Sequence, residues 1–211
     1  METTKWLRAQ AQNGDADAQF RLGYRLRFSR RPELRDHGGA VRMWAAASSH
    51  GHPRAQFYLG ISYDLGVGVA RNLGKAVHYY RLAAKNGHDV AKYNLARCYL
   101  NGEGVRPNAR VGVALLRQAA ELSNVDAQRD LGFHLHEGVG VRRNYAEAAH
   151  WYSQAAAAGD PKAQWNLGLC YLSGEGIEAS RRRAVVWIRR AAAKGHRASK
   201  HWLRANVRSA L

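Results

Sequence analysis

Ten histidines are the first side chains to consider for catalysis or metal binding in this chain, and they form only one tight cluster. His134, His136 and Glu137 stand close together, and imidazole and carboxylate groups are common metal ligands. On a helix, however, side chains two positions apart point about 200° away from each other, whereas metalloproteases space their histidine pair four positions apart. No serine or cysteine nucleophile motif is present. The sequence therefore predicts that the chain is not an enzyme and has no catalytic residue, no metal and no cofactor.

A second chemical pattern, Gly-x-Gly, could cradle a phosphate group with its backbone amides. The pattern begins at Gly66, Gly102, Gly138 and Gly174. Phosphate-binding loops follow a strand and open a helix, whereas each of these pairs closes a stretch of helical character. We therefore interpret the pairs as turns, in which glycine ends one helix and reverses the chain.

The elements that must position these groups follow from an internal repeat of 36 residues. The segment at residues 91–105, AKYNLARCYLNGEGV, returns at 127–141 as AQRDLGFHLHEGVGV and at 163–177 as AQWNLGLCYLSGEGI. Related copies begin at Ala55 and, in degenerate form, at Ala18. A fixed period of this length is typical of stacked supersecondary units, and abundant alanine with few β-branched residues favours helices as those units.

Each copy continues into a second helical segment, in which a small residue precedes a bulky pair and a closing glycine, for which Ser123 substitutes once. In the first segment, a small residue after the recurring leucine lets two helices approach closely; these residues are Gly23, Gly60, Ala96, Gly132 and Gly168. One such hairpin cannot bury its own apolar stripe. The sequence therefore predicts an all-α fold: a right-handed α/α superhelix, or solenoid, of about five helix–turn–helix repeats.

No break in composition divides the chain, so we expect one domain over residues 1–211. Its predicted parts are an N-terminal capping helix at 1–15, repeats at 16–51, 52–87, 88–123, 124–159 and 160–195, and a C-terminal capping helix at 196–211. Terminal half-units of this kind are expected caps of a repeat stack. The first repeat lacks the Gly-x-Gly pair, and residues 28–39 predict a loop of different shape there.

The motif A-x-x-x-L-G-x-x-Y-x-x-G-x-G-V, followed by alanine, an aromatic pair and A-A-x-x-G, resembles the Sel-one-like repeat family, a relative of the tetratricopeptide repeat. The resemblance covers essentially the whole chain. It implies an α/α superhelix whose first helices line a concave groove, and a role as an adaptor or scaffold that binds proteins. Many extracytoplasmic members staple each repeat with a disulfide, and this sequence lacks those cysteines.

Cys98 and Cys170 occupy equivalent positions two repeats apart, which places them about 20 Å apart in a stack and beyond the reach of a disulfide. We interpret them as small buried apolar residues. The N-terminus lacks the apolar run of a secretory signal, and no stretch approaches the roughly 18 apolar residues of a membrane span. These features predict a soluble, cytoplasmic chain without a transmembrane segment.

Alignment with the tetratricopeptide pattern places two rows of first-helix side chains on the groove. The first groove row lies two positions before the recurring leucine and comprises Phe20, Phe57, Tyr93, Arg129 and Trp165. The second groove row lies two positions after it and comprises Tyr24, Ile61, Arg97, Phe133 and Leu169. Aromatic and arginine anchors suit an extended peptide or short helix with acidic and apolar groups. The alternative interpretation is that the aromatic side chains only pack between repeats.

Lysine and arginine number 33 against 16 acidic residues, which gives a net charge of +17 and favours an acidic protein partner. No acidic residue follows Glu178, and the basic side chains there form the C-terminal basic patch: Arg181, Arg182, Arg183, Arg189, Arg190, Arg197, Lys200 and Arg204. Two alternatives stay open: a solvated surface without a binding role, and a basic surface that binds nucleic acid or an anionic membrane as a regulatory factor. No recognised nucleic-acid motif is present, and nothing in the sequence sets the oligomeric state.

Overall fold

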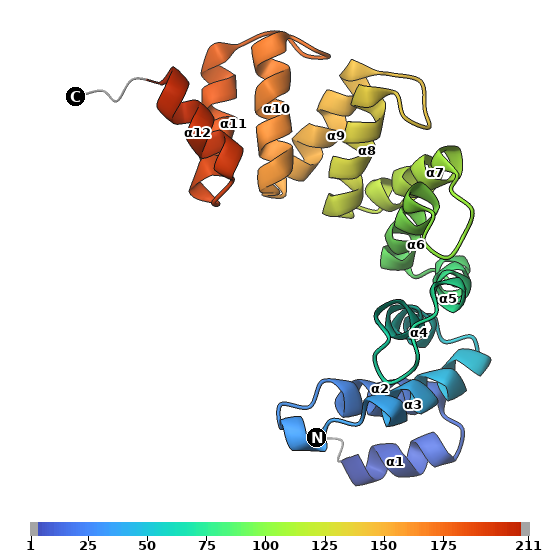
Figure 1. Cartoon of the computed structure of the whole chain (residues 1–211). Coiled ribbons are helices and arrows are strands. Elements are labelled where there is room, and N and C mark those ends of the chain that lie inside the picture. Colours follow the sequence, from blue (N-terminus) through green and yellow to red (C-terminus); the bar gives the residue numbers. More distant parts are fainter. Residues whose placement is uncertain (1–3, 208–211) are drawn as a thin grey trace. The chain divides into compact units, whose positions relative to one another are not determined.

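The computed structural model describes residues 4–207, and all regular structure in that part of the chain is helical (Figure 1). Twelve α-helices and one 3₁₀ helix lie in these residues, and no strand occurs among them. The α-helices are α1 (Thr4–Gln12), α2 (Ala16–Arg27), α3 (His37–Ser49), α4 (Pro53–Leu65), α5 (Leu73–Lys85), α6 (Asp89–Asn101), α7 (Ala109–Glu121), α8 (Val125–Glu137), α9 (Tyr145–Ala157), α10 (Pro161–Ser173), α11 (Arg181–Ala193) and α12 (Arg197–Asn206). The predicted all-α fold of paired helices is therefore confirmed.

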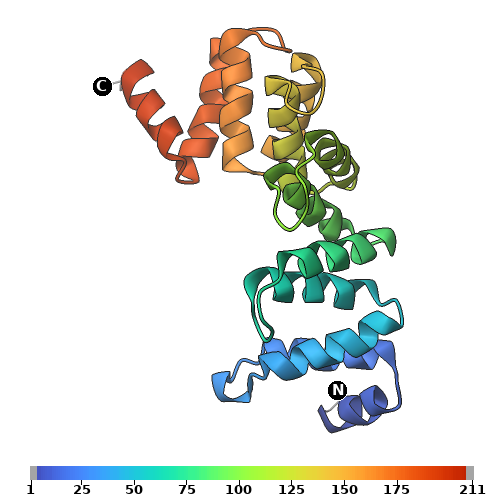
Figure 2. The ribbon, with the colours of Figure 1, turned by 45° about the vertical axis from the view of Figure 1, so that its right-hand side comes forward.

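The chain forms two compact units, one that ends at Asn108 and one that begins at Ala109. The N-terminal unit holds α1 to α6 and the C-terminal unit holds α7 to α12, so each contains two complete hairpins with a single helix on either side. Within each unit, the two helices of a hairpin lie side by side and pack on the next helix along the chain (Figure 1, Figure 2). One continuous domain over residues 1–211 stays a prediction.

Capping side chains and glycines define where the helices begin and end. Asp160 precedes α10, and its carboxylate accepts a hydrogen bond from the backbone N–H of Ala163 at 2.6 Å. Asn124 caps α8 in the same way through the N–H of Ala127 at 2.9 Å. At its other end α10 stops at Gly174, whose φ of +77° is left-handed. These residues satisfy the backbone groups that a helix end leaves without partners.

The two helices of a hairpin meet where a small residue of the first faces a bulky residue of the second. A Cβ atom on Gly132 would lie 2.7 Å from the ring of Tyr152, which is closer than van der Waals contact permits. Gly23 gives Trp44 the same room, and the indole N–H there donates to the carbonyl of Phe20 at 3.3 Å. The bulky residues that fill the hairpins within the two units are all buried: Trp44, Tyr80, Tyr152 and Ile188. Removal of this apolar surface from water stabilises each hairpin.

A recurring glutamine fastens a first helix to the helix that precedes it. The side-chain amide N–H groups donate to backbone carbonyls at 3.1 to 3.4 Å, and the pairs are Gln19 with Ala11, Gln56 with Ser48, Gln128 with Ala120 and Gln164 with Ala156. All four glutamine residues are buried. Each of these carbonyls also accepts a hydrogen bond from a backbone N–H in the turn that follows its helix, so the glutamine supplies a second donor that joins one repeat to the next within each unit.

The loop of the first repeat differs from the others, as the sequence predicts. Helix α2 ends at Phe28 instead of a left-handed glycine, and the 3₁₀ helix η1 (Pro32–Leu34) follows. Asp36 then caps α3 by accepting a hydrogen bond from the N–H of Gly39 at 2.7 Å. Phe28 and Leu34 are 46% and 57% exposed, so this loop leaves apolar side chains on the surface of the N-terminal unit.

Candidate partner-binding site

The aromatic side chains of the first groove row pack against the residue that precedes the next first helix. In the N-terminal unit, Phe20 stacks on the imidazole of His52 with ring centres 4.7 Å apart, and Phe57 stacks on His88 at 4.2 Å. Phe20 is only 7% exposed. Packing between repeats, the alternative that the sequence left open, is therefore the role that the structure shows for these two rings, whether or not they also touch a partner.

Arg129 holds the same row position in the C-terminal unit and makes ion pairs instead of ring contacts. Its guanidinium lies 2.7 Å from the carboxylate of Asp126, 2.8 Å from that of Asp130 and 3.1 Å from that of Asp160. Burial alone would lower the pKa of Arg129, but Asp130 and the other two carboxylates raise it. Since Asp160 precedes α10, this network also joins one repeat to the next.

The second groove row is more accessible. Tyr24, Phe133 and Leu169 are 44%, 50% and 39% exposed, respectively. Arg97 is exposed and Ile61 is half-buried. Side chains of this row can therefore contact another molecule without first leaving a packed interior.

A hollow of about 650 Å³ lies on the first helices of the N-terminal unit, and we call it the N-terminal hollow. It brings together three predicted groove residues, Phe20 and Tyr24 from α2 and Phe57 from α4. The other lining residues are Arg21, Arg25, Arg54, Tyr58, His88 and Val90. The structure therefore gathers aromatic rings and three arginines around one opening.

Aromatic rings and arginines set the chemistry of the N-terminal hollow. Tyr58 stacks on Trp44 with ring centres 5.0 Å apart and meets Tyr24 edge-on at 5.8 Å. Burial, followed by the nearby Tyr24, raises the pKa of Tyr58, so its hydroxyl keeps its proton, and that hydroxyl also hydrogen-bonds Tyr24. Burial lowers the pKa of His88, which leaves arginine as the source of positive charge.

A smaller hollow of about 360 Å³ lies on the first helices of the C-terminal unit. It brings together the predicted groove residues Arg129, Phe133 and Trp165, and Trp165 lies tilted against His196 with ring centres 5.6 Å apart. The other lining residues are Asp130, Lys162 and Asn166. Because Arg129 is already bonded to three carboxylates, this hollow offers less positive charge than the N-terminal hollow.

Four predicted groove residues are absent from the lining of both hollows: Ile61, Tyr93, Arg97 and Leu169. Sequence reasoning in turn missed Arg54 and Tyr58, which line the N-terminal hollow. Their spacing of four on α4 was a usable signal, since residues four apart share a helix face. Tyr58 stands just before the recurring leucine, where another repeat carries Asn94, and that asparagine hydrogen-bonds Tyr80 of the preceding helix. The position before the leucine therefore contacts the preceding helix in both repeats, and in the second repeat its side chain also lines the N-terminal hollow.

The histidine cluster joins two repeats. His134 places its Nδ1 atom 3.0 Å from the carbonyl oxygen of Val139, while His136 lies between the carboxylates of Glu137 and Glu175 at 2.9 and 3.1 Å. Burial alone would lower the pKa of His136, but hydrogen bonds to Glu137 and Glu175 outweigh burial and raise it. Within residues 4–207, no three His, Cys, Asp or Glu side chains gather closely enough to hold a metal ion.

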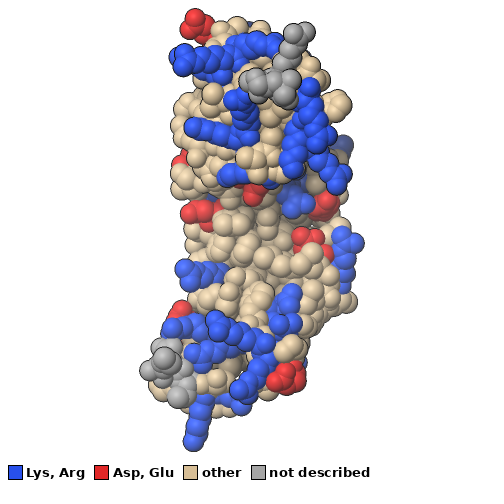
Figure 3. Space-filling model, turned by 90° about the vertical axis from the view of Figure 1, so that its left-hand side faces the viewer, with Lys and Arg blue, Asp and Glu red and all other residues tan. Residues whose placement is uncertain are grey.

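The C-terminal basic patch lies on α11 and α12, and all of its side chains are exposed. Figure 3 shows lysine and arginine side chains, in blue, gathered on the surface of the C-terminal unit, and further basic side chains on the surface of the N-terminal unit. The predicted patch is therefore a surface cluster that solvent and a partner can both reach.

The two cysteines are buried, and the described helices are of ordinary length and polarity. Cys98 and Cys170 are buried free thiols, and burial raises the pKa of each to about 11. Each thiol therefore keeps its proton near neutral pH. No helix among residues 4–207 is both long enough and apolar enough to span a bilayer.

Paired helices with a 36-residue period, flanked by single helices, define an α-helical repeat protein. The chain belongs to the Sel1 repeat family, whose family model matches residues 16–52, 53–88, 89–124, 125–160 and 161–196. Each match ends one residue after the boundary predicted from the sequence. Sel1 repeat proteins generally mediate protein–protein interaction and are typically non-catalytic scaffolds.

Solved structures share the fold over nearly the whole chain. A protective antigen of uropathogenic Escherichia coli that displays an SLR fold is 30% identical, with a TM-score of 0.89 over 98% of this chain and 45% of its own. A Sel1 repeat protein from Oxalobacter formigenes is 32% identical, with a TM-score of 0.83 over 96% of this chain and 58% of its own. The chain thus spans about half the length of these two proteins.

One curated protein shares part of the sequence. DAP3-binding cell death enhancer 1 of Rattus norvegicus is 40% identical over 67 residues, which are 32% of this chain and 13% of that protein.

Proposed function

We propose that the chain is a non-catalytic, cytoplasmic scaffold that binds an acidic segment of a partner protein in the N-terminal hollow. The segment carries carboxylates that pair with arginine and an apolar side chain that packs on the exposed ring of Tyr24. Membership in the Sel1 repeat family supports a protein partner. The name of the rat relative, which describes it as DAP3-binding, supports the same class of function.

The composition of the N-terminal hollow carries this proposal. Arg21, Arg25 and Arg54 line the opening together with Tyr24 and Phe57, and the carboxylate of Asp17, which pairs with Arg21 at 3.6 Å, lies outside the lining. Arginine is the side chain best suited to carboxylates, because its planar donors form paired hydrogen bonds. Aromatic rings at the same opening supply the apolar contacts that dominate binding energy. An acidic and apolar peptide fits both demands at once.

Other observations extend the proposed contact surface. The second groove row presents Phe133 and Leu169 with 50% and 39% of their surface exposed, so the C-terminal unit offers apolar contacts of its own. The smaller hollow there offers Lys162 and Trp165. The N-terminal hollow has the greater positive charge and is the expected main site.

Binding of defined peptides tests the proposal. Labelled peptides of about ten residues that alternate glutamate with leucine and phenylalanine should bind and raise fluorescence anisotropy, whereas the same peptides with lysine in place of glutamate should not. Arg54→Glu should weaken binding at least tenfold, or about 1.4 kcal/mol. Lys85→Glu changes the charge equally on an exposed residue of α5 and should leave affinity unchanged.

Three results would count against the proposal. The first is an absence of binding by every acidic peptide. The second is an equal loss of affinity in Arg54→Glu and Lys85→Glu, since net charge alone would then explain binding. The third is a peptide that mass spectrometry finds cleaved or modified after incubation, because a scaffold returns its ligand unaltered.

A further inference from the structure

The last two helices carry positive charge without acidic residues among them. Glu178 is the last acidic residue of the chain, and the C-terminal basic patch that follows it is fully on the surface. Solvated protein surfaces ordinarily mix charges of both signs. A run of one sign therefore sets up a potential that attracts polyanions to α11 and α12.

Aromatic rings are interleaved with these charges. The guanidinium of Arg190 lies 4.6 Å from the ring centre of Trp187, and that of Arg181 lies 5.9 Å from the ring centre of Trp202. Arg183 lies 5.8 Å from the ring centre of Tyr171, on α10. Cation–π contacts of this kind are individually weak at exposed sites, and they bring planar rings and guanidinium groups together on the patch.

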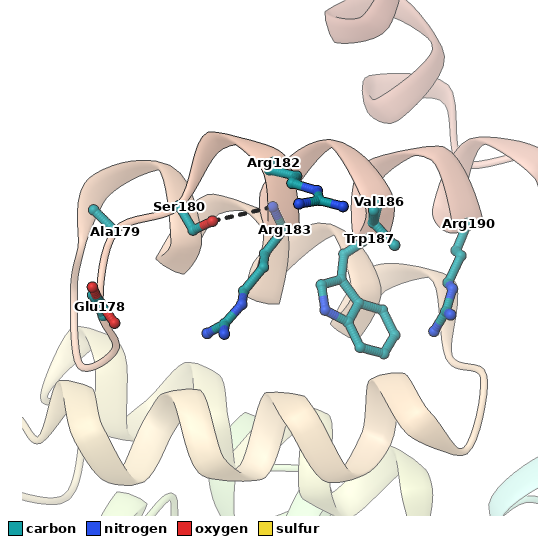
Figure 4. Close-up of a pocket in the computed structure, with 8 residues that line it drawn as sticks. All are labelled: Glu178, Ala179, Ser180, Arg182, Arg183, Val186, Trp187 and Arg190. Carbon is teal, nitrogen blue, oxygen red and sulfur yellow. Dashed lines mark hydrogen bonds between the residues drawn. The ribbon is translucent and has the colours of Figure 1, made fainter.

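A hollow of about 450 Å³ lies along α11 at this patch. Arg183, Trp187 and Arg190 are spaced by four and three residues, so they share one face of the helix. Figure 4 shows their side chains directed to the same side of α11, with the indole of Trp187 between the two guanidinium groups. Glu178 stands at the far end of the hollow, beyond Arg183. The arrangement is one flat apolar ring with a cation on either side.

We propose that this face of α11 binds single-stranded nucleic acid, independently of the N-terminal hollow. A base stacks on the indole of Trp187, and the flanking phosphates bind Arg183 and Arg190. Non-specific single-strand binders combine a basic track with aromatic rings in this manner, because every base has a π-face that can stack. The order of cation, ring and cation on one face of α11 gives the phosphates and the base separate partners.

Other polyanions fit this face less well. Insertion into an anionic membrane needs exposed bulky apolar side chains, and Val186 is the only large hydrophobic residue of α11 and α12 that is exposed in the described structure. Duplex nucleic acid keeps its bases stacked inside, so the ring of Trp187 would gain nothing from it. An acidic peptide offers carboxylates to the arginines but lacks a row of planar groups.

Fluorescence anisotropy with labelled oligouridine and oligothymidine of about 12 nucleotides tests the proposal on the full chain. The native protein should bind both, with an affinity that falls steeply as salt rises. The test variants are Arg183→Glu and Trp187→Leu. The position equivalent to Arg183 is already a glutamate in the fourth repeat, Glu147, and the position equivalent to Trp187 is already a leucine in the third repeat, Leu115. Both variants should therefore fold, which circular dichroism checks. Each should weaken binding about fivefold or more.

Matched controls distinguish a site from net charge. Arg106→Glu makes the same charge reversal on an exposed loop residue of the N-terminal unit, and Trp151→Leu makes the same ring deletion one repeat earlier. Both controls should bind like the native chain. The proposal is overturned if no oligonucleotide binds at low salt, if Trp187→Leu retains full affinity, or if Arg106→Glu loses as much as Arg183→Glu. Equal affinity for a duplex of the same length or for phosphatidylserine vesicles also overturns it.

Discussion

Replacement of Gly140 by alanine should destabilise the C-terminal unit far more than replacement of Gly195. Both glycines have left-handed backbones, with φ of +75° and +91°, so either alanine introduces backbone strain of about 1 kcal/mol. Their surroundings differ. A Cβ atom on Gly140 would lie 2.7 Å from the backbone carbonyl of Ala109, at the start of α7, whereas nothing lies within 4 Å of the equivalent atom on Gly195.

The difference between the two variants isolates the close approach of loop and helix. Overpacking against backbone adds about 1 to 3 kcal/mol, so Gly140→Ala should lose about 2 to 4 kcal/mol in total and Gly195→Ala about 1 kcal/mol. Urea unfolding followed by far-UV circular dichroism measures both, and a change in the slope would reveal a loss of cooperativity between repeats. Equal losses in the two variants would refute the idea that the second glycine of each Gly-x-Gly pair is required by close packing.

Three further perturbations follow from particular contacts. Because the pKa of His136 is raised in the fold, the protonated imidazole contributes stability that is fully present below the ordinary pKa of about 6.5 and is lost as pH rises through the raised pKa. His136→Gln should therefore lower the melting temperature more at about pH 5.5 than at about pH 8.5. An equal drop at both pH values would contradict the pairing with Glu175. Gln128→Leu removes one of two donors to the carbonyl of Ala120, the other being the N–H of Ser123 at 2.9 Å, and should lose about 0.5 to 1.5 kcal/mol in urea unfolding; no loss would contradict a stabilising role for that bond. Ser123, at φ +63°, is strained, so Ser123→Gly should gain about 1 kcal/mol by the same measurement while Ser123→Ala gains nothing.

The repeat made most of the fold predictable, because its period locates both the helices and their ends. Ser123 illustrates this: its place in the period predicted a closing position normally held by glycine, and its φ is positive. The glutamine hydrogen bonds were not predicted, because the sequence shows Gln19 and its equivalents only as polar residues. It does not show which carbonyl of the preceding helix accepts a hydrogen bond from each side chain. A contact between elements of different repeats depends on the distance at which they stack, which the period alone does not reveal.

The candidate site was only partly predictable. The two groove rows located Tyr24 and Phe57 at the N-terminal hollow, because helix periodicity fixes which side chains share a face. Periodicity could not separate rings that pack on a neighbour, such as Phe20 on His52, from rings that stay accessible. It also could not show that carboxylates surround Arg129, since one of them, on Asp160, arrives from the next repeat. Pairing across repeats therefore reduces the positive charge that Arg129 can offer a partner.

Hydrogen–deuterium exchange with and without a bound acidic peptide tests the central claim most directly. The N-terminal hollow is built on α2 and α4, so the peptide should slow amide exchange in those two helices and at the start of α6, where His88 and Val90 lie. Exchange in α11 and α12 should stay unchanged. Protection confined to α11 and α12, with none in α2 or α4, would contradict the assignment of the N-terminal hollow as the partner-binding site.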